Sequence, residues 1–259
     1  MTLLGGRFEF GREARIALTG SDFGPAVDGH ATPMWQCIQV KSGQVLTVGP
    51  TRSGARCYLC VGGGIRVPVV LGSRSTHVLT GFGGHEGRAL KKNDKLALGP
   101  DSTPAAARPL KVEPRVLDRL YPDGAFRITR GPQVGWFTPE SIATLGRSEY
   151  VVTEDSNRVG LRLEGPVLAR LKGGQLVTEG VALGAVQVPD AGQPIVLLVE
   201  QPTTGGYPKI ANVIFADLHR LGQLRPRDET RFEWVEMQRA VEALREQAGL
   251  IAPQALVPA

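Results

Sequence analysis

Short stretches in which apolar and polar residues alternate follow one another along most of the chain, the pattern of strands with one buried face. Each stretch is bounded by Gly, Pro, Asp or Ser, which favour turns. We therefore expect a mainly β fold. The predicted strands are ARIALTG (residues 14–20), QVLTVG (44–49), ARCYLCVGG (55–63), DKLALG (94–99), AFRITRG (125–131), YVVTEDS (150–156), VGLRLEG (159–165), QLVTEGVALGAVQVP (175–189) and PIVLLVEQ (194–201).

Helical periodicity is confined to a few segments, of which two are clear. In TPESIATLGR, Thr138 can cap a short helix, Pro139 suits its first position and Gly146 ends it. The segment EMQRAVEALREQAG predicts a longer terminal helix with one apolar stripe and a final glycine that stops it. The stripe consists of Met237, Val241, Leu244 and Ala248, and the glycine is Gly249.

A segment rich in Pro and Ala, between Gly99 and Pro114, lacks apolar periodicity and separates the strands into two groups. Such a segment is typical of a domain boundary. We expect one β-domain at residues 1–105 and a second, which carries the terminal helix, at residues 114–259.

A weak internal repeat favours two related domains over one large one. Ser42–Gly49 resembles Gly173–Gly180, an offset of 173 − 42 = 131 residues. Leu90–Leu96 resembles Leu224–Thr230, an offset of 224 − 90 = 134 residues. Near-equal offsets on both sides of the predicted boundary indicate that the two halves share a fold.

Charge and hydropathy narrow the classes of partner. The formal net charge is +5, but 30 Lys and Arg residues alternate with 25 Asp and Glu residues rather than cluster. This mixture indicates a solvated surface and no nucleic-acid partner. The longest aliphatic run, Ile195–Val199, is too short to span a bilayer, and the N-terminus lacks the features of a secretion signal. We expect no membrane partner and, by default, a cytoplasmic location.

Several kinds of site have no support in the sequence. Cys57 and Cys60 have C-x-x-C spacing, but residues three apart in a strand face opposite sides, which denies them a shared metal. Three cysteines, an odd number, also argue against a disulfide framework. There is no zinc-protease, nucleophile-elbow or P-loop motif, and we expect no metal site. His77 and His85 lie in or beside glycine-rich loops, where an acid–base role and a plain surface role both stay open.

Two loops carry residues suited to binding anionic oxygen. The first contains Ser73, Arg74, Ser75 and Thr76, and the second contains Thr203, Thr204, Gly205, Gly206, Tyr207 and Lys209. Glycines let backbone N–H groups approach an anion, hydroxyls donate hydrogen bonds, and an arginine can hold a carboxylate with two parallel bonds. Hairpin turns that need glycine at positive φ explain the same residues equally well.

Six motifs closely resemble, in order and spacing, those of one family. They are LGSRST, GGHEGRALKKNDKLALG, GPQVGWFTPE, SNRVGLRLEG, EGVALGAVQVPDAGQPIVLL and PTTGGYPKIA. The family contains the C subunit of 5-oxoprolinase, the second subunit of allophanate hydrolase, the KipA proteins and the carboxyltransferase part of urea carboxylase. The likeness extends to about Val235. It implies two cyclophilin-like β-barrel domains with a few short helices.

The resemblance also implies an activity and partners. It implies a hydrolase subunit that acts on a cyclic amide C–N bond, in an ATP-dependent 5-oxoprolinase that converts 5-oxoproline to glutamate. ATP would be a co-substrate, and the partners would be a related cyclophilin-like protein (the KipI-like B subunit) and a catalytic A subunit. The alternatives are a biotin-dependent carboxyltransferase or allophanate hydrolase-type subunit for urea-like amides, and a non-enzymatic KipA-type regulator that binds a kinase inhibitor. The motifs are common to all three.

The chain departs from the family pattern at two places. Family members normally begin with a further segment that carries T-T-x-Q-D-x-G-R-like and G-A-M-D-like motifs, and neither motif is found here. We therefore expect the first barrel to be incomplete at its N-terminus. Glu200-Gln201 replaces the usual Asp-Arg before the Thr-Thr-Gly-Gly motif, which removes one cation. The methionines, Met1, Met34 and Met237, form no Met-Lys-Met turn, so this chain has no site for covalent biotin.

If the chain acts in lactam hydrolysis, the site must hold a phosphate, an amide and a carboxylate together, and we assign roles within the two loops on that basis. Arg74 and Lys209 would bind anionic oxygens, and Gly205 and Gly206 would donate N–H groups to a developing oxyanion. Tyr207 would donate a hydrogen bond or position the substrate. The predicted catalytic residues are thus Tyr207 and Lys209. The predicted substrate-binding or phosphate-binding residues are Ser73, Arg74, Ser75, Thr76, Thr203, Thr204, Gly205 and Gly206.

Overall fold

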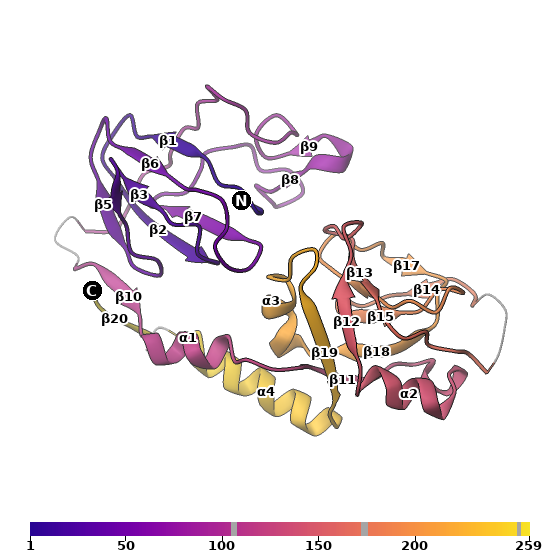
Figure 1. Cartoon of the computed structure of the whole chain (residues 1–259). Helices are drawn as coiled ribbons and strands as arrows, with labels where there is room; N and C mark the ends of the chain where they lie inside the picture. Colours follow the sequence, from indigo (N-terminus) through magenta and orange to yellow (C-terminus); the bar gives the residue numbers. More distant parts are fainter. Residues whose placement is uncertain (105–107, 172–175, 253–254) are drawn as a thin grey trace. The chain divides into compact units, whose positions relative to one another are not determined.

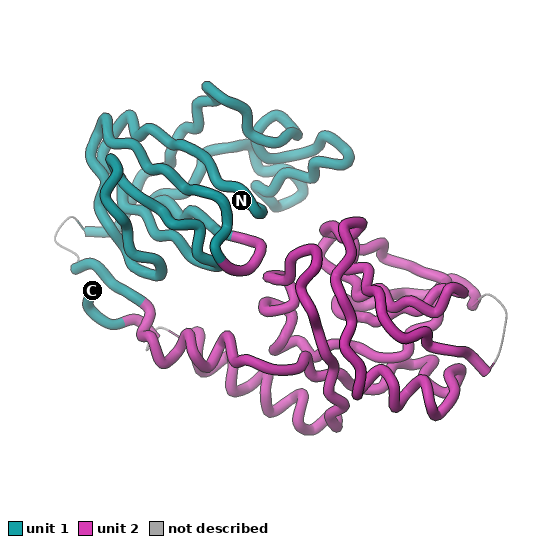
Figure 2. Tube along the Cα trace, in the orientation of Figure 1, with its two compact units in different colours: residues 1–52, 57–111, 257–259 teal, residues 53–56, 112–256 magenta. Residues whose placement is uncertain are grey.

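A computed structural model describes residues 1–104, 108–171, 176–252 and 255–259, and the fold is mainly β, as the sequence predicts (Figure 1). The chain divides into two compact units (Figure 2). Unit 1 consists of Met1–Arg52, Cys57–Lys111 and Val257–Ala259, and unit 2 consists of Ser53–Arg56 and Val112–Leu256. Residues 105–107 of the predicted linker and residues 173–175 of the predicted repeat lie outside the described residues.

Unit 1 is built from short strands in three small sheets, ordered β1-β6-β3-β4, β5-β2-β7 and β8-β9. The bounds are β1 Arg7–Glu9, β2 Ala14–Gly20, β3 Ala26–Val27, β4 His30–Ala31, β5 Ile38–Val40, β6 Val45–Thr47, β7 Cys57–Val61, β8 Thr76–His77, η1 Val78–Thr80 and β9 Phe82–Gly83. Alternate residues point into a core that includes Ile16, Leu18, Val40 and Leu46. The alternation in the sequence therefore marks the buried face correctly.

Unit 2 contains a closed barrel of strands in the order β11-β18-β15-β16-β13-β12-β19, together with a small ribbon, β14-β17. The elements are α1 Pro114–Leu120, β11 Phe126–Arg130, η2 Val134–Trp136, α2 Pro139–Leu145, β12 Glu149–Val152, β13 Gly160–Glu164, β14 Glu179–Gly180, β15 Ala185–Gln187, β16 Ile195–Leu197, β17 Thr204–Gly205, β18 Lys209–Val213, η3 Phe215–Asp217, α3 Leu218–Leu221, β19 Glu229–Trp234 and α4 Met237–Leu250. Two further strands, β10 Leu110–Val112 and β20 Leu256–Pro258, pair with each other. The barrel encloses the largest apolar core, with Ile128, Tyr150, Val186, Ile210 and Phe232 among its members.

The capped helix is confirmed residue by residue. Pro139 begins α2, and the Thr138 side chain accepts a hydrogen bond from the Ser141 N–H at 3.1 Å. Gly146 is the residue at its C-terminal end. Capping is a local interaction, which is why a single sequence predicts it.

The terminal helix forms, but its apolar stripe is not its buried face. Met237 is 65% exposed, and Val241 and Leu244 are exposed as well. The helix packs on η3 through Ala240 and Ala243, each one residue before Val241 or Leu244 of the stripe. One residue corresponds to a turn of about 100° around the helix axis, so the buried face lies about 100° from the stripe. The small side chain of alanine lets the helix pack closely against this segment. The helix also continues to Leu250, one residue past the predicted stop at Gly249.

Two further expectations about elements are wrong. Residues 94–99 do not form a strand, because their pairing within the described chain is limited to an isolated bridge between Leu98 and Ile65. Alternate residues of the segment are nevertheless less exposed than their neighbours. A strand needs a continuous neighbour to bond with, and the pattern does not show whether one is present. The predicted linker contains β10, and it is followed directly by α1, which the apolar pattern does not indicate.

The repeat between Leu90–Leu96 and Leu224–Thr230 corresponds to one kind of turn that occurs in both units. Asp94 accepts a hydrogen bond from the Lys91 N–H at 2.7 Å, and Asp228 accepts one from the Arg225 N–H at 2.8 Å. The residue before each aspartate, Asn93 or Arg227, has a φ of +74°. The sequence match between Leu90–Leu96 and Leu224–Thr230 therefore reflects equal backbone geometry.

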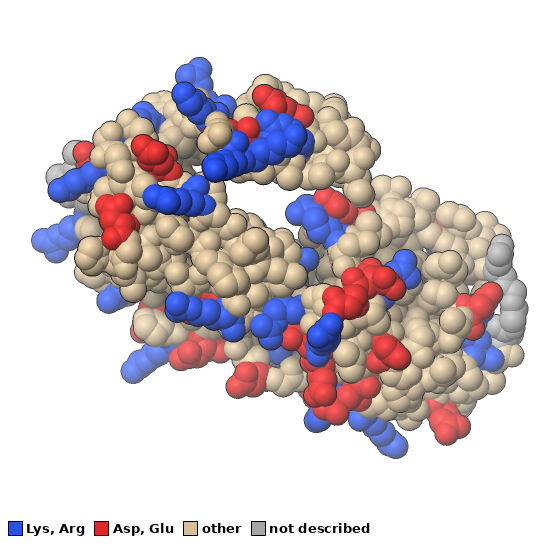
Figure 3. Space-filling model, turned by 45° about the horizontal axis from the view of Figure 1, so that its top comes forward, with Lys and Arg blue, Asp and Glu red and all other residues tan. Residues whose placement is uncertain are grey.

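Basic and acidic side chains are interspersed on the face seen in Figure 3. Among the residues that the structure describes, no helix is long and apolar enough to cross a membrane.

Candidate functional site

Lys209 occupies an unusual position for a charged residue. It begins β18 and is only 2% exposed. It pairs in register with Gln187 of β15, directly beside a β-bulge between Val186 and Gln187. Gln187 is 5% exposed. Residues paired across neighbouring strands send their side chains to the same face, so Lys209 and Gln187 share one face of the sheet beside the bulge.

Gln133 holds Lys209 in place from the segment that follows β11. The Gln133 Oε1 atom accepts a hydrogen bond from the Lys209 N–H at 3.1 Å, and the Gln133 N–H donates to the Lys209 carbonyl, also at 3.1 Å. Gly131 makes this approach possible, because a Cβ atom there would collide with the Lys209 carbonyl. The GPQ part of the motif GPQVGWF thus has a structural role at Lys209.

Glu179 of β14 provides the negative charge near Lys209. The Lys209 Nζ atom forms an ion pair with Glu179 Oε1, and Gln133 Nε2 donates to the same oxygen at 2.8 Å. These two donors, Lys209 first, hold the pKa of the Glu179 carboxyl below its ordinary value. Glu179 is partly exposed, whereas the lysine is buried beneath it.

Two donors at this position, Lys209 Nζ and Gln187 Nε2, are buried. The Lys209 ammonium is paired with the Glu179 carboxylate. The Gln187 Nε2 amide has no hydrogen-bond acceptor within the described residues. Buried polar groups are usually satisfied, and exceptions often mark binding or catalytic sites.

The first glycine of the TTGGYPK loop, Gly205, lies against the Gln187 amide. Gly205 pairs with Glu179 in the β14–β17 ribbon, and a Cβ atom on Gly205 would lie 2.7 Å from Gln187 Nε2. Neither Gly205 nor Gly206 has a positive φ, so the explanation by a hairpin turn is wrong for both. Close approach to the Gln187 amide explains Gly205 instead.

The other predicted residues of this loop are more exposed. Thr203 and Thr204 are exposed, and Tyr207 is 50% exposed, two positions from the buried Lys209. Glu200, which replaces the usual Asp, forms an ion pair with Arg158 at 2.8 Å. The loop therefore presents hydroxyls to solvent above a buried cation.

The first predicted loop belongs to unit 1 and is a tight hairpin. Val70 and Ser73 exchange two backbone hydrogen bonds, and Leu71 and Gly72 between them both have positive φ, which defines a type I′ turn. Ser73 Oγ accepts from the Ser75 N–H at 3.0 Å. Arg74 and Ser75 are exposed and Thr76 is partly buried at the start of β8. Turn geometry thus accounts for Gly72, while the hydroxyls and Arg74 remain accessible.

Sequence reasoning missed Gln133, Glu179 and Gln187. Two signals were present: a glutamine inside the motif GPQVGWF, and a glutamine at an otherwise apolar position of the strand GAVQVP. Neither shows by itself that the side chains converge, because they come from segments up to 76 residues apart.

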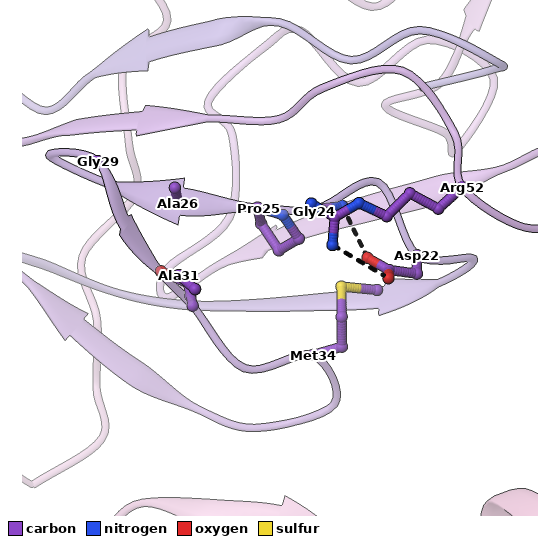
Figure 4. A pocket seen from close by; sticks show the side chains of 9 residues that line it. Asp22, Gly24, Pro25, Ala26, Gly29, Ala31, Met34 and Arg52 are labelled. Atoms are coloured by element: carbon purple, nitrogen blue, oxygen red, sulfur yellow. Dashed lines mark hydrogen bonds and ion pairs between the residues drawn. The ribbon is translucent and has the colours of Figure 1, made fainter.

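Two other features of the described residues lie apart from this cluster. Cys57 is buried and Cys60 is exposed, as expected for opposite faces of a strand. Unit 1 has a cavity of about 380 Å³ beside β3 and β4, with Asp22 and Arg52 3.6 Å apart on its lining (Figure 4). None of the predicted site residues lines it. No group of three or more described His, Cys, Asp or Glu residues is placed to hold a metal ion.

Comparison with known proteins identifies relatives across nearly the whole chain. Residues 1–234 match the family described as carboxyltransferase domain, subdomain A and B. The chain is 36% identical over 239 residues to the 5-oxoprolinase C subunit of Escherichia coli (strain K12), covering 92% of this chain and 75% of that protein. It is 33% identical over 247 residues to urea amidolyase of Saccharomyces cerevisiae, covering 90% of this chain and 13% of that protein.

Solved structures agree with these relatives. The crystal structure of the K. lactis urea amidolyase superimposes with a TM-score of 0.87 at 30% identity, covering 97% of this chain and 16% of that chain. The K. lactis urea carboxylase gives a TM-score of 0.85 at 30% identity and covers 97% of this chain and 24% of that chain. This protein thus belongs to the carboxyltransferase-domain family that includes the C subunit of 5-oxoprolinase.

Proposed function

We propose that this chain is a subunit of an ATP-dependent 5-oxoprolinase, which hydrolyses the cyclic amide of 5-oxoproline to glutamate together with partner subunits. The observation that carries the proposal is a pair of buried donors: Lys209 Nζ, which is paired with Glu179, and Gln187 Nε2, which has no acceptor within the described residues. The similarity to two bacterial 5-oxoprolinase C subunits supports the choice of substrate.

The chemistry of lactam opening fits such donors. An amide resists water until its oxygen is phosphorylated or otherwise stabilised, so the site must bind oxygen atoms that gain negative charge. Lys209 supplies a positive charge and Gln187 supplies an N–H group, both shielded from water, where electrostatic interactions are strongest. In this scheme they bind the lactam oxygen or the phosphoryl group attached to it.

Access to the donors requires movement of the ribbon above them. Lys209 Nζ and Gln187 Nε2 are inaccessible to solvent, and Gly205 of β17 lies against the glutamine amide. The ribbon β14–β17 consists of two residues per strand, so few backbone bonds oppose its displacement. In the open state, the N–H groups of Gly205 and Gly206 and the hydroxyls of Thr203 and Thr204 would contact the same ligand.

The partners and the co-substrate belong to the same proposal. The relatives are named as subunits of a larger enzyme or are parts of longer chains, so this protein works with partner subunits. We place a related cyclophilin-like protein, the KipI-like B subunit, and a catalytic A subunit among them. ATP is the co-substrate in this scheme, and Arg74 of unit 1 is the predicted contact for an anionic oxygen.

A carboxyltransferase for urea-like amides is the second candidate. Urea amidolyase and urea carboxylase relatives, and the description of the family itself, favour it. A carboxyl group carried on biotin also develops charge on oxygen, which the same donors would bind. Biotin would then arrive on a separate carrier.

The two candidates are separated by supplying different substrates to one complex. The chain is purified with its partner subunits, and ATP hydrolysis is measured with 5-oxoproline, and separately with urea, bicarbonate and a biotinylated carrier. We expect hydrolysis that depends on 5-oxoproline and yields glutamate. Dependence on urea and biotin alone would select the carboxyltransferase. Arg74→Ala should raise the KM for 5-oxoproline or ATP, with Arg66→Ala as a matched control on a neighbouring segment of unit 1.

A further inference from the structure

The carboxylate of Glu179 occupies the place beside Lys209 that an anionic ligand would take. Glu179 Oε1 is paired with Lys209 Nζ and accepts a hydrogen bond from Gln133 Nε2 at 2.8 Å. One oxygen atom thus receives two donors. Glu179 belongs to the short strand β14, whereas the donors belong to β18 and to the segment that follows β11. The structure therefore shows, within unit 2 alone, how these donors hold an anionic oxygen.

The amide of Gln133 is fixed with its donor side toward Glu179. Its Oε1 atom accepts a hydrogen bond from the Lys209 N–H at 3.1 Å, and the Gln133 N–H donates to the Lys209 carbonyl at the same distance. Because the Lys209 N–H requires an acceptor, the amide oxygen must lie on that side and Nε2 on the other. Gln133 is buried. Its Nε2 atom would therefore donate to any oxygen that replaced the Glu179 carboxylate.

A third donor on the same face of the sheet is not used by Glu179. Gln187 Nε2 is buried and has no acceptor within the described residues. Gln187 pairs in register with Lys209, and its amide lies against Gly205, which pairs with Glu179 in the β14–β17 ribbon. The Glu179 carboxylate thus satisfies two of three donors. A phosphoryl group has three oxygen atoms that point in different directions, so it has an acceptor for each donor.

The Lys209 ammonium can give up Glu179 only in exchange for another anion. Lys209 is 2% exposed, and a buried charge without a partner is strongly destabilising. A neutral molecule would not compensate for loss of the carboxylate. The Glu179 side chain, by contrast, is 42% exposed, so its charge can be solvated by water once it is released. An exchange of one anion for another leaves no buried charge unpaired.

The strand that carries Glu179 is weakly attached. β14 and β17 have two residues each, and their pairing is extended by one hydrogen bond, from the Val181 N–H to the Thr203 carbonyl at 3.1 Å. The donors, in contrast, are held by the barrel strands β15 and β18 and by the backbone bonds of Gln133. Displacement of Glu179 therefore leaves the three donors in position.

We propose that Glu179 is the displaceable counter-ion of a subsite for a phosphoryl group, which takes its place on Lys209, Gln133 and Gln187. The identity of the natural ligand, the phosphorylated form of the lactam, rests on the proposed function, but the exchange does not. In the absence of ligand, Glu179 keeps the buried ammonium charge paired. Removal of the Glu179 charge should therefore strengthen anion binding, whereas loss of a residue that binds the ligand would weaken it.

Titration of the purified chain with inorganic phosphate tests the exchange without reference to activity. Isothermal titration calorimetry should show that Glu179→Gln binds phosphate at least about 10-fold more tightly than the wild type, because it removes a unit charge that competes at contact distance. Glu149→Gln is the matched control. Glu149 is 45% exposed and pairs with Arg231, so this variant makes the same chemical change elsewhere in the barrel and should bind phosphate as the wild type does.

A second substitution locates the bound phosphate. Lys209→Met, introduced into Glu179→Gln, should abolish the gain in affinity, because the ammonium is the charge that binds the phosphate. An affinity of Glu179→Gln equal to or below that of the wild type would overturn the proposal. A gain that persists after Lys209→Met would overturn it as well.

Glu179→Asp covers the case in which Glu179→Gln does not fold. Its carboxylate keeps the charge but is one methylene group shorter, so it cannot reach both donors from the same backbone position, and phosphate should bind more tightly than to the wild type. If only this variant folds, a wild-type affinity for phosphate would overturn the exchange. A reconstituted wild-type complex that is inactive toward 5-oxoproline would refute the proposed function instead, and the phosphate titrations would still decide the exchange.

Discussion

Lys209 and Gln187 are buried polar residues, but Lys209 Nζ is paired with the Glu179 carboxylate, whereas Gln187 Nε2 has no acceptor within the described chain. Leaving a buried donor without an acceptor costs about 1–3 kcal/mol, a large part of the stability of an ordinary domain. By contrast, Gln133 uses both its side chain and its backbone to bind its neighbours. The three residues are adjacent, yet they should respond differently to substitution.

Replacement of Gln187 by leucine should therefore separate stability from activity. Gln187→Leu removes an unsatisfied donor, and we expect the free energy of unfolding to rise by about 1 kcal/mol while activity falls. Gln133→Leu, the matched control, breaks hydrogen bonds to Lys209 and Glu179 and should lower stability by about 2 kcal/mol. Urea denaturation of both variants measures the difference. Equal destabilisation would show that Gln187 is an ordinary structural residue.

Tyr150 gives a prediction about alkaline pH. It is fully buried in the barrel core, and burial raises its pKa to about 12. The folded state thus favours the neutral phenol, so its contribution to stability is complete below pH about 10 and is lost as the pH rises to about 12. By pH 11.5 the loss relative to Tyr150→Phe should reach about 2 kcal/mol, from about 1.5 pH units above the ordinary pKa at about 1.4 kcal/mol each. Denaturation at pH 8 to 11.5 measures this, and Tyr207→Phe, which alters an exposed tyrosine, should follow the wild type.

Single elements differ in how well local sequence determines them. α2 is bounded by Thr138, Pro139 and Gly146, which act on their immediate neighbours, so its ends follow from sequence. For α4, the local sequence predicts that a helix forms but not which face is buried. The buried face depends on η3, which packs against Ala240 and Ala243. The segment at residues 94–99 shows the same limit, because pairing depends on another part of the chain.

The N-cap of α2 has a measurable contribution. Thr138→Ala removes the acceptor for the Ser141 N–H, and we expect a loss of about 1 kcal/mol in the free energy of unfolding. Thr138→Ser keeps the hydroxyl oxygen and should retain most of the stability. If Thr138→Ala unfolds at the same denaturant concentration as the wild type, the capping interaction is unimportant in this helix.

At the scale of the whole molecule, the repeat and the two loops connect sequence with function. The turn at Asp94 in unit 1 recurs at Asp228 in unit 2, which explains the sequence repeat in structural terms. The chemistry and motifs of the sequence predict the loop residues Ser73–Thr76 and Thr203–Lys209, and their roles stay a prediction. The pattern does not single out Gln133, Glu179 and Gln187, because their side chains come from the segment after β11, from the β14–β17 ribbon and from barrel strand β15, and tertiary folding brings these elements together.

The central claim is that the buried Lys209 cluster binds the reacting oxygen of a cyclic amide. The most direct measurement compares 5-oxoproline-dependent ATP hydrolysis by the reconstituted complex that contains the wild-type chain or Lys209→Met. Methionine keeps the length of the side chain and removes its charge. We predict that Lys209→Met assembles normally and lowers kcat by at least about 100-fold, as expected for loss of a donor to a developing oxyanion. Wild-type activity in a correctly assembled Lys209→Met complex would contradict the claim.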